Sequence, residues 1–320
     1  MFKYVVKRIL LMLLTFLIII SICFVLIKLV PRELSQDKMA NKAFMEKLKA
    51  LGYDKPIITQ LLIYLKNLIF HLDMGLSWEI EINVPVSEMI VRKLPPTILV
   101  NVYSLIISVP IGIAFGIFAA LKKNKWQDTL ISTMVMVFVS VPSFVYAFLL
   151  QYFLGFKWKL FPLTTSSLSD AGGTWFSWIM IKSMVLPVLA LSFGTIAGLT
   201  RFTRAELTET LTSDYMLLAR TKGLTKSQAV THHALKNAMV PILPSIISSF
   251  VSILSGSLII EGIFAIPGIG GLYIKSINML DYDVFMGCNA FYVFIGLAAS
   301  IVVDLSYGFI DPRIRMGASK

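Results

Sequence analysis

Residues 97–121 read TILVNVYSLIISVPIGIAFGIFAAL, a run without a charged side chain. About 20 apolar residues suffice for one α-helix to cross the hydrocarbon core of a bilayer. Five more runs of that scale occur, at 9–30, 129–155, 183–200, 239–260 and 287–310. The sequence therefore predicts an all-α polytopic membrane protein with six transmembrane helices.

The composition also indicates a membrane protein. Hydrophobic residues fill 57% of the 320 positions, and the mean hydropathy of +0.79 exceeds that of ordinary soluble domains. The net charge is +11, but the basic residues lie largely at the ends of the apolar runs, which argues against nucleic-acid binding. Cys23 and Cys288 both lie inside apolar runs, so we expect neither a disulfide framework nor a metal site.

Basic residues in the short loops predict the orientation of the spans. They precede the first run and follow the second, fourth and sixth: Lys3, Lys7, Arg8, Lys122, Lys123, Lys125, Arg201, Arg204, Arg220, Lys222, Lys226, Lys236, Arg313, Arg315 and Lys320. This pattern predicts cytoplasmic N- and C-termini, with 31–96 and 261–286 outside. Lysines in the loop at 156–182 argue the other way, but an even number of spans agrees with the majority. Pro31-Arg32 follows the first run in place of a signal-peptide cleavage site, so we expect that run to remain as an anchor.

The features divide the chain into three expected regions. These are a tail with the first span at 1–30, an extracellular segment at 31–96, and a core at 97–320 that includes a cytoplasmic segment at 201–238. Within the extracellular segment, Lys42 to Leu51 and Ile57 to Phe70 have the apolar spacing of short amphipathic helices on the membrane rim. They either cover the core or cap a substrate site, and both interpretations remain open.

Small residues and prolines recur inside the apolar runs. Gly112 and Gly116 are four residues apart, as are Gly194 and Gly198, and this spacing lets helix backbones approach closely. The approach could join helices of one chain or of two chains. Prolines are expected to bend the spans that contain them, namely Pro110, Pro142 and Pro187.

Catalytic motifs are absent from the sequence. It contains no GxxxxGK[ST] phosphate loop, no GxSxG elbow and no HExxH pair. His232 and His233 are adjacent, so on a helix they point about 100° apart and cannot form an i, i+4 metal pair. Asp304, near the end of the last run, is expected to contact a neighbouring helix or loop instead of relaying protons. We therefore predict a chain that is not an enzyme and binds no metal or cofactor itself.

The polar stretch at 211–241, LTSDYMLLARTKGLTKSQAVTHHALKNAMVP, is expected to form two helices. Asp214 suits the start of the first helix, Arg220 and Lys222 its end, and Gly223 a left-handed residue that terminates it. Thr225 to Gln228 match the S/T-x-x-E/Q capping box, which predicts a second helix running through Asn237 into the fifth span.

The first of these helices has a face that a partner could bind. Tyr215, Leu218, Ala219 and Lys222 recur at spacings of three and four residues, so together they could enter a groove on another protein. A basic helix lying on the membrane surface would show the same pattern.

This stretch resembles the cytoplasmic coupling motif of binding-protein-dependent ABC importer permeases, in the peptide and nickel branch. The similar residues are Ala219-Arg220-x-Lys222-Gly223-Leu224, His233-Ala234-Leu235-Lys236-Asn237-Ala238 and Pro241. Leu217 and Leu218 stand where the general motif has Glu and its first Ala, so contacts that need the Glu are not expected here.

Further similarity extends over nearly the whole chain and is closest to the first, B-type, transmembrane subunit of oligopeptide and dipeptide permeases. The similar segments are Leu51-Gly52-Tyr53-Asp54-Lys55-Pro56, Leu72-Asp73-Met74-Gly75-Leu76-Ser77, Pro95-Pro96-Thr97, Pro142-Ser143-Phe144, the segment from Glu261 to Gly270, Asp281-Tyr282, and the C-terminal segment from Asp304 to Arg315. Their order along the chain matches that of the family.

The resemblance implies a type I ABC importer permease fold and a complex of five parts. The expected partners are a homologous second permease subunit, two ATPase subunits that bind ATP and Mg, and an extracellular substrate-binding protein. The chain would form the translocation path for peptide substrate in a bacterial inner membrane. Its coupling residues would be Asp214, Tyr215, Leu218, Ala219, Arg220, Lys222 and Gly223. A nickel or metal-chelate importer and an ion-coupled secondary transporter remain as alternatives.

Two further sets of residues are candidates for contact with substrate or with the binding protein. The loop Pro267-Gly268-Ile269-Gly270 is either a tight structural turn or a mobile element that reaches toward the binding protein. Asn101, Gln151 and Asn289 could line a pore, although polar residues in spans also serve as hydrogen-bond partners between helices.

Overall fold

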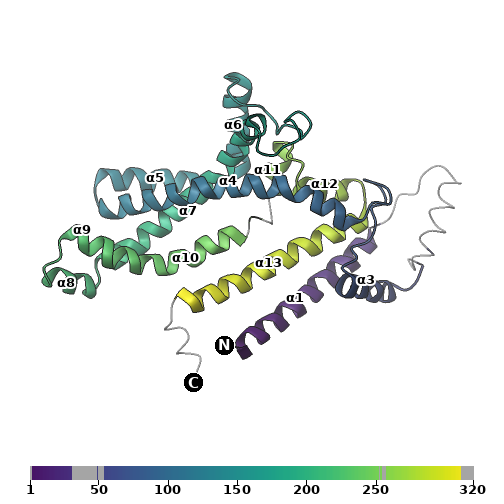
Figure 1. Ribbon diagram of the computed structural model, residues 1–320, viewed down its shortest axis with the longest axis horizontal. Helices are drawn as coiled ribbons and strands as arrows, with labels where there is room; N and C mark the ends of the chain where they lie inside the picture. Colours follow the sequence, from purple (N-terminus) through teal and green to yellow (C-terminus); the bar gives the residue numbers. More distant parts are fainter. Residues whose placement is uncertain (1, 31–48, 50–53, 252, 254–256, 311–320) are drawn as a thin grey trace. The chain divides into compact units, whose positions relative to one another are not determined.

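A computed structural model describes residues 2–30, 49, 54–251, 253 and 257–310 of the chain (Figure 1). Within these ranges the backbone is helical with no β-strand, and the only β-type pairing is a single antiparallel bridge between Leu76 and Pro85. The predicted all-α class is confirmed.

The helices follow one another along the chain in a simple order. They are α1 (Phe2–Leu29), α3 (Ile57–His71), α4 (Val86–Leu121), α5 (Trp126–Ser140), α6 (Ser143–Leu150), the π-helix η1 (Gln151–Lys157), α7 (Trp178–Leu211), α8 (Asp214–Thr221), α9 (Lys226–Ala229), the π-helix η2 (Val230–Ala234), α10 (Leu235–Val251), α11 (Leu258–Ile263), α12 (Ile269–Asn278) and α13 (Tyr282–Ile310).

Five helical segments in the described residues are long and apolar enough to cross a membrane. They are Val5–Leu29, Val86–Leu121, Trp178–Leu211, Lys226–Val251 and Tyr282–Ser306. A sixth span results if α5 and the segment Ser143–Lys157 are counted as one broken span. The predicted amphipathic helix from Ile57 to Phe70 is observed as α3, whereas the stretch from Lys42 to Leu51 falls almost entirely outside the described residues.

The run at 129–155 is not the single straight helix that its composition predicts. The chain bends by 97° between α5 and the segment Ser143–Lys157, and α6 stands across α5 in Figure 1. Pro142 explains the break because a proline pushes the preceding residue out of the helical region. Val141 is indeed extended, with φ −90° and ψ 125°.

The ends of other helices also differ from the apolar runs. Helix α10 ends at Val251 and α11 begins at Leu258, so the run at 239–260 is not one helix. In contrast, α4 and α7 extend beyond the runs at 97–121 and 183–200 because polar turns continue the helix outside the apolar part. Apolar length alone therefore located these spans but not their boundaries.

Residue contacts divide the chain into two compact units. The first unit contains residues 1–94 and 271–297, and the second contains 95–270 and 298–320. This division crosses the predicted core region, because 271–297 group with the N-terminal residues. In the first unit, Ile20 and Phe24 of α1 pack with Leu68 of α3 and with Met286 and Ala290 of α13.

Helix α7 is the centre of the second unit. Its residues Met180, Met184 and Leu186 form an apolar core with Ile260 and Phe264 at the α11 end of the unit. The same helix packs along α5, α6 and α10. Helices α8 and α9 lie at the far end of α7 from this core, as Figure 1 shows.

The two pairs of spaced glycines have different surroundings. A Cβ atom on Gly116 would lie 2.5 Å from Thr203 Cβ and 2.9 Å from the Thr200 carbonyl oxygen of α7, and Gly112 is similarly close to α7. These glycines let α4 and α7 of one chain touch. A Cβ on Gly194 or Gly198 would meet nothing within 4 Å among the described atoms, so this second pair makes no close approach there.

We predict that Gly116→Ala destabilises the chain and Gly198→Ala does not. The extra methyl group at 116 must push α4 and α7 apart, at a cost of about 1–3 kcal/mol. At 198 the methyl group has space, and alanine is the better helix former. Thermal unfolding of the purified full-length variants in detergent measures the difference. Equal midpoints for the two variants would contradict the proposed close contact.

Candidate functional site

The segment after α7 forms the predicted helix, turn and helix. Helix α8 ends at Thr221, and Gly223 adopts the left-handed conformation with φ +84°. The Leu224 N–H donates to the Ala219 carbonyl, as is usual where a glycine ends a helix. Both hydrogen bonds of the capping box between Thr225 and Gln228 are present. Helices α9, η2 and α10 then continue without a gap to Val251, as predicted.

One face of α8 is packed into the second unit. Met216 and Ala219 lie in an apolar cluster with Ala120 of α4, Leu207 of α7 and Ala234 of η2. Ala219 is only 4% exposed, so within this chain it lies on the packed face of α8, whereas Tyr215 and Lys222 are exposed. The small side chain of Ala219 lets α8 lie close to the ends of neighbouring helices.

The opposite face of α8 is exposed, and the side chains on it are apolar and basic. Leu217 and Leu218 are 65% and 55% exposed, and Tyr215 is also exposed. The charged residues of the segment are on the surface as well, namely Asp214, Arg220 and Lys222. Of the predicted coupling residues, the structure therefore leaves all but Ala219 accessible, and it adds Leu217.

The loop from Pro267 to Gly270 wraps around a buried carboxylate. Glu261 is 3% exposed, and its Oε2 accepts a 2.8 Å hydrogen bond from the Gly270 N–H. Thr97 of α4 donates its hydroxyl to Glu261 Oε1 at 2.9 Å and accepts the Ile269 N–H at 3.1 Å. The two side chains thus satisfy N–H groups in the first turn of α12, which have no partner within that helix.

Glycine is needed at 268 because the carboxylate lies against the backbone. A Cβ atom there would overlap both Glu261 Oε2 and Thr97 Oγ1, and at Gly270 it would lie 2.8 Å from Glu261 Oε2. Glu261 and Thr97 hold the C-terminal end of this loop in a tight turn, and a contact of the loop with the binding protein stays a prediction.

A second buried carboxylate holds a turn of the first unit. Asp281 is fully buried, and its Oδ2 accepts hydrogen bonds from the Ser77 hydroxyl at 2.7 Å and from the N–H groups of Trp78 and Glu79 at 3.0 Å each. The Ile80 N–H donates to the same oxygen at 3.2 Å. One carboxylate oxygen therefore orders the turn at 77–80.

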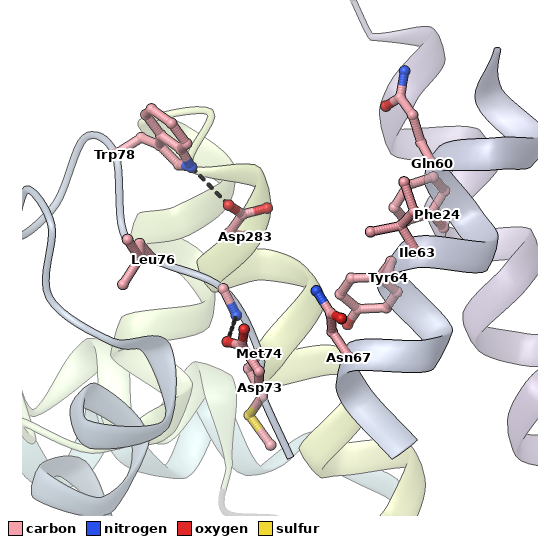
Figure 2. Close-up of a pocket in the computed structure, with 11 residues that line it drawn as sticks. Phe24, Gln60, Ile63, Tyr64, Asn67, Asp73, Met74, Leu76, Trp78 and Asp283 are labelled. Atoms are coloured by element: carbon pink, nitrogen blue, oxygen red, sulfur yellow. Dashed lines mark hydrogen bonds between the residues drawn. The ribbon is translucent and has the colours of Figure 1, made fainter. Parts of the chain in front are cut away.

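A pocket of about 280 Å³ lies beside this turn, between α1, α3 and the start of α13 (Figure 2). Asp283 and Asp73 line it and each accept a hydrogen bond, from Trp78 Nε1 at 2.6 Å and from the Gly75 N–H at 2.9 Å. The buried Tyr64 hydroxyl also lines it and has no hydrogen-bond partner in the described part of the chain. Burial raises the pKa of Tyr64, and the charge of Asp283 raises it further, so this hydroxyl keeps its proton.

The three residues predicted to line a pore are divided between the units: Asn101 and Gln151 belong to the second and Asn289 to the first. Gln151 donates to the carbonyls of Leu163 and Ile263 at 2.8 and 3.2 Å, which gives it a structural role within the second unit. Asn101 donates to the Thr97 carbonyl one turn earlier in α4. Asn289 belongs to the other unit, where its buried Nδ2 finds no acceptor among the described atoms.

Sequence reasoning missed the residues that organise these loops. Glu261, Thr97 and Asp281 lie in motifs that carry the family resemblance, but no local pattern connects residues 164 positions apart, as Thr97 and Glu261 are. Asp128 was missed in the same way: it is buried and forms an ion pair with Arg204 of α7. For Glu261 the available signal was the set of glycines that follow it, Gly262, Gly268 and Gly270.

We predict that Glu261→Gln lowers the stability of the chain. An amide offers one acceptor oxygen where the carboxylate uses two, so one donor of the Thr97 and Gly270 pair loses its partner, at a cost of about 1–3 kcal/mol. Glu209→Gln is the matched control because Glu209 is exposed. The melting temperatures of both purified variants test this, and an unchanged midpoint for Glu261→Gln would show that the carboxylate does not hold the loop.

Comparison with known proteins covers the chain almost from end to end. Residues 112–316 match the family described as binding-protein-dependent transport system inner membrane component, and residues 1–101 match the N-terminal region of such membrane components. A chain of the crystal structure described as an amino acid ABC transporter with histidines is 20% identical, with a TM-score of 0.49, and the match covers 69% of this chain and 94% of that one.

Several relatives match over their full length. The dipeptide transport system permease protein of Bacillus subtilis is 36% identical over 99% of both chains. The protein of the same name from Lactococcus lactis is 35% identical over 99% of this chain and 100% of its own. A putative peptide transport system permease protein of Brucella abortus is 34% identical over 93% and 94% of the two chains. The chain therefore belongs to the family of binding-protein-dependent transport system inner membrane components.

Proposed function

We propose that this chain is the transmembrane subunit of an ATP-driven importer and forms part of the path through which peptides cross the inner membrane. The observation that carries the proposal is the end-to-end match to dipeptide permeases, at 36% and 35% identity. The six spans, counted with the bent pair, and the exposed α8 surface support it.

The proposed complex contains a homologous second permease subunit, two ATPase subunits and an extracellular substrate-binding protein. ATP and Mg are bound by the ATPase subunits, and this chain hydrolyses nothing. In this proposal the termini and the segment containing α8 lie in the cytoplasm, which agrees with the basic residues that follow the second and fourth apolar runs.

The geometry of α8 fits a coupling element. Its exposed face offers Tyr215, Leu217 and Leu218 to an apolar groove on an ATPase subunit. Its buried face, through Met216 and Ala219, is packed against the ends of the spans. A displacement of α8 would therefore move α7 and α10 with it, because close-packed side chains transmit strain.

The substrate class can be tested on the assembled complex. We expect that a short peptide, presented with the cognate binding protein, stimulates ATP hydrolysis by the complex purified with its co-encoded neighbours and reconstituted in vesicles. A nickel chelate presented in the same way is the matched control and should leave hydrolysis at its basal rate. Stimulation by the chelate alone would replace the peptide assignment with a metal-chelate one.

The coupling role of the α8 turn has its own test at Gly223. A Cβ at this position would meet nothing within 4 Å among the described atoms, so within this chain a substitution acts through the backbone conformation. In Gly223→Val, the left-handed conformation costs about 1–2 kcal/mol, and we expect peptide uptake to fall while basal ATP hydrolysis persists or the ATPase subunits dissociate. Gly223→Asn is the control because asparagine tolerates this conformation.

Comparison of Gly223→Val with Gly223→Asn separates an effect of the backbone conformation at 223 from a loss of folded or assembled protein. Uptake by Gly223→Asn should remain close to that of the unmodified chain, with the complex intact on gel filtration. Unchanged uptake by an intact Gly223→Val complex would show that this turn plays no part in coupling.

A further inference from the structure

A pocket of about 570 Å³ lies between the end of α4, the start of α5, the end of α7, and helices α8 and α9. Its charged lining residues are Lys123, Lys125, Arg220, Lys226 and Asp214. Four cations face one carboxylate, so the lining carries an excess of positive charge. In the part of the chain that the structure describes, none of the four cations forms an ion pair.

A hydroxyl group on the wall of this pocket also lacks a partner. Thr208 of α7 lines the pocket, and its Oγ1 is buried without a hydrogen bond to any described residue. A buried hydroxyl without a partner is costly unless something else binds it. The pocket thus combines unpaired cations with an unused hydrogen-bond donor, which is the chemistry that recognises an oxyanion.

The N-terminal turn of α8 adds to this positive character. Ser213 precedes the helix, but its hydroxyl donates to the Thr210 carbonyl at 2.6 Å and does not cap α8. Ser213 and Asp214 both line the pocket. The positive end of the helix dipole is therefore directed toward the same space as the cations.

The position of the pocket along the spans indicates where its ligand comes from. The spans formed by α4 and α7 end at Leu121 and Leu211, and both leucines line the pocket. Trp126, one residue after Lys125, is 71% exposed, and exposed tryptophan at the end of a span is typical of the headgroup layer. The side of the pocket formed by the end of α4 and the start of α5 is thus at the depth of lipid phosphates, whereas α7 continues to Leu211, past its apolar run at 183–200.

An ion pair holds the basic loop of the pocket in place. The Arg204 guanidinium donates hydrogen bonds to both carboxylate oxygens of Asp128, and its Nη2 lies 2.8 Å from Oδ2. The same Oδ2 accepts the Asn124 N–H at 3.0 Å. This ties the loop that carries Lys123 and Lys125 to α7, one helical turn before Thr208. The backbone that carries Lys123 and Lys125 is therefore fixed beside the part of α7 that contains Thr208.

We propose that this pocket binds the phosphate group of an anionic phospholipid at the membrane surface. The lysines and Arg220 neutralise the phosphate, Thr208 donates a hydrogen bond to it, and the apolar residues at the ends of the spans contact the start of the acyl chains. Basic pockets between spans are known to take such headgroups. This site goes beyond the transport function and does not depend on the substrate being a peptide.

Lipid binding to the detergent-solubilised complex with its full-length chain tests the proposal. Native mass spectrometry would count bound dioctanoyl phosphatidylglycerol, with dioctanoyl phosphatidylcholine and inorganic phosphate as comparison ligands. The test variant is Lys123→Gln/Lys226→Gln. The matched control is Lys122→Gln/Lys236→Gln, which removes the same charge from lysines that do not line the pocket.

We expect the test variant to bind phosphatidylglycerol about 25-fold more weakly, and the control to change by about twofold or less. Inorganic phosphate binding with the same dependence on Lys123 and Lys226, without lipid binding, would support the phosphate site and identify free phosphate as its source. Equal losses in both double variants would overturn the proposal, because the effect would then be general surface charge. Equal phosphatidylglycerol affinity in all three proteins would overturn it as well.

Thr208→Val provides a second readout that a structural role would not give. The hydroxyl has no hydrogen bond to lose within the described chain, so the melting temperature should not fall. Phosphatidylglycerol affinity should nevertheless drop by about tenfold or more, the loss of one hydrogen bond to a charged group. A lower melting temperature with unchanged lipid affinity would contradict the proposed role of this residue.

Discussion

A buried backbone needs a hydrogen-bond partner for every N–H and C=O group, and this constraint shapes the whole chain. Within a continuous helix, the backbone groups are hydrogen-bonded to one another. Wherever a helix breaks inside the protein, a side chain must supply the missing partner. At three of the turns in the described chain, a buried carboxylate takes that role.

Three buried carboxylates accept hydrogen bonds from backbone N–H groups at turns of the described chain. Glu261, with Thr97, binds the N–H groups at the start of α12. Asp281 binds the turn at 77–80. Asp128 binds Asn124 and is neutralised by Arg204. Each carboxylate accepts several donors at once, which offsets the cost of removing its charge from water. The few charges that are buried therefore mark where the chain turns.

The distinction between local patterns and contacts between distant segments explains what the sequence could predict. The spans follow from apolar length, because that property is local. The α8 turn follows from Gly223 and the Thr225 capping box, which act over four residues or fewer and are both observed. The burial of Ala219 does not follow from the sequence, because helical spacing groups it with Tyr215, whereas its packing depends on α4, α7 and η2, which only the folded chain brings together.

The bend at Pro142 illustrates a different limit of sequence reasoning. The proline itself predicts a bend, but not one of 97°. Past the bend, Gln151 donates hydrogen bonds to the Leu163 carbonyl after η1 and to the Ile263 carbonyl at the end of α11. Contacts between segments more than a hundred residues apart, such as Gln151 and Ile263, cannot be read from local pattern, and they set the path of the chain where the helix is interrupted.

The same packing logic bears on the proposed coupling. An element that only touches a partner can change the balance between two states of the spans only if its own position differs between them. Helix α8 has almost no freedom to move alone, because Met216 and Ala219 are packed among the ends of α4, α7 and the α9 to α10 segment. Any state that displaces α8 must then displace those helix ends too. The buried Ala219 is thus as necessary to the proposed mechanism as the exposed leucines.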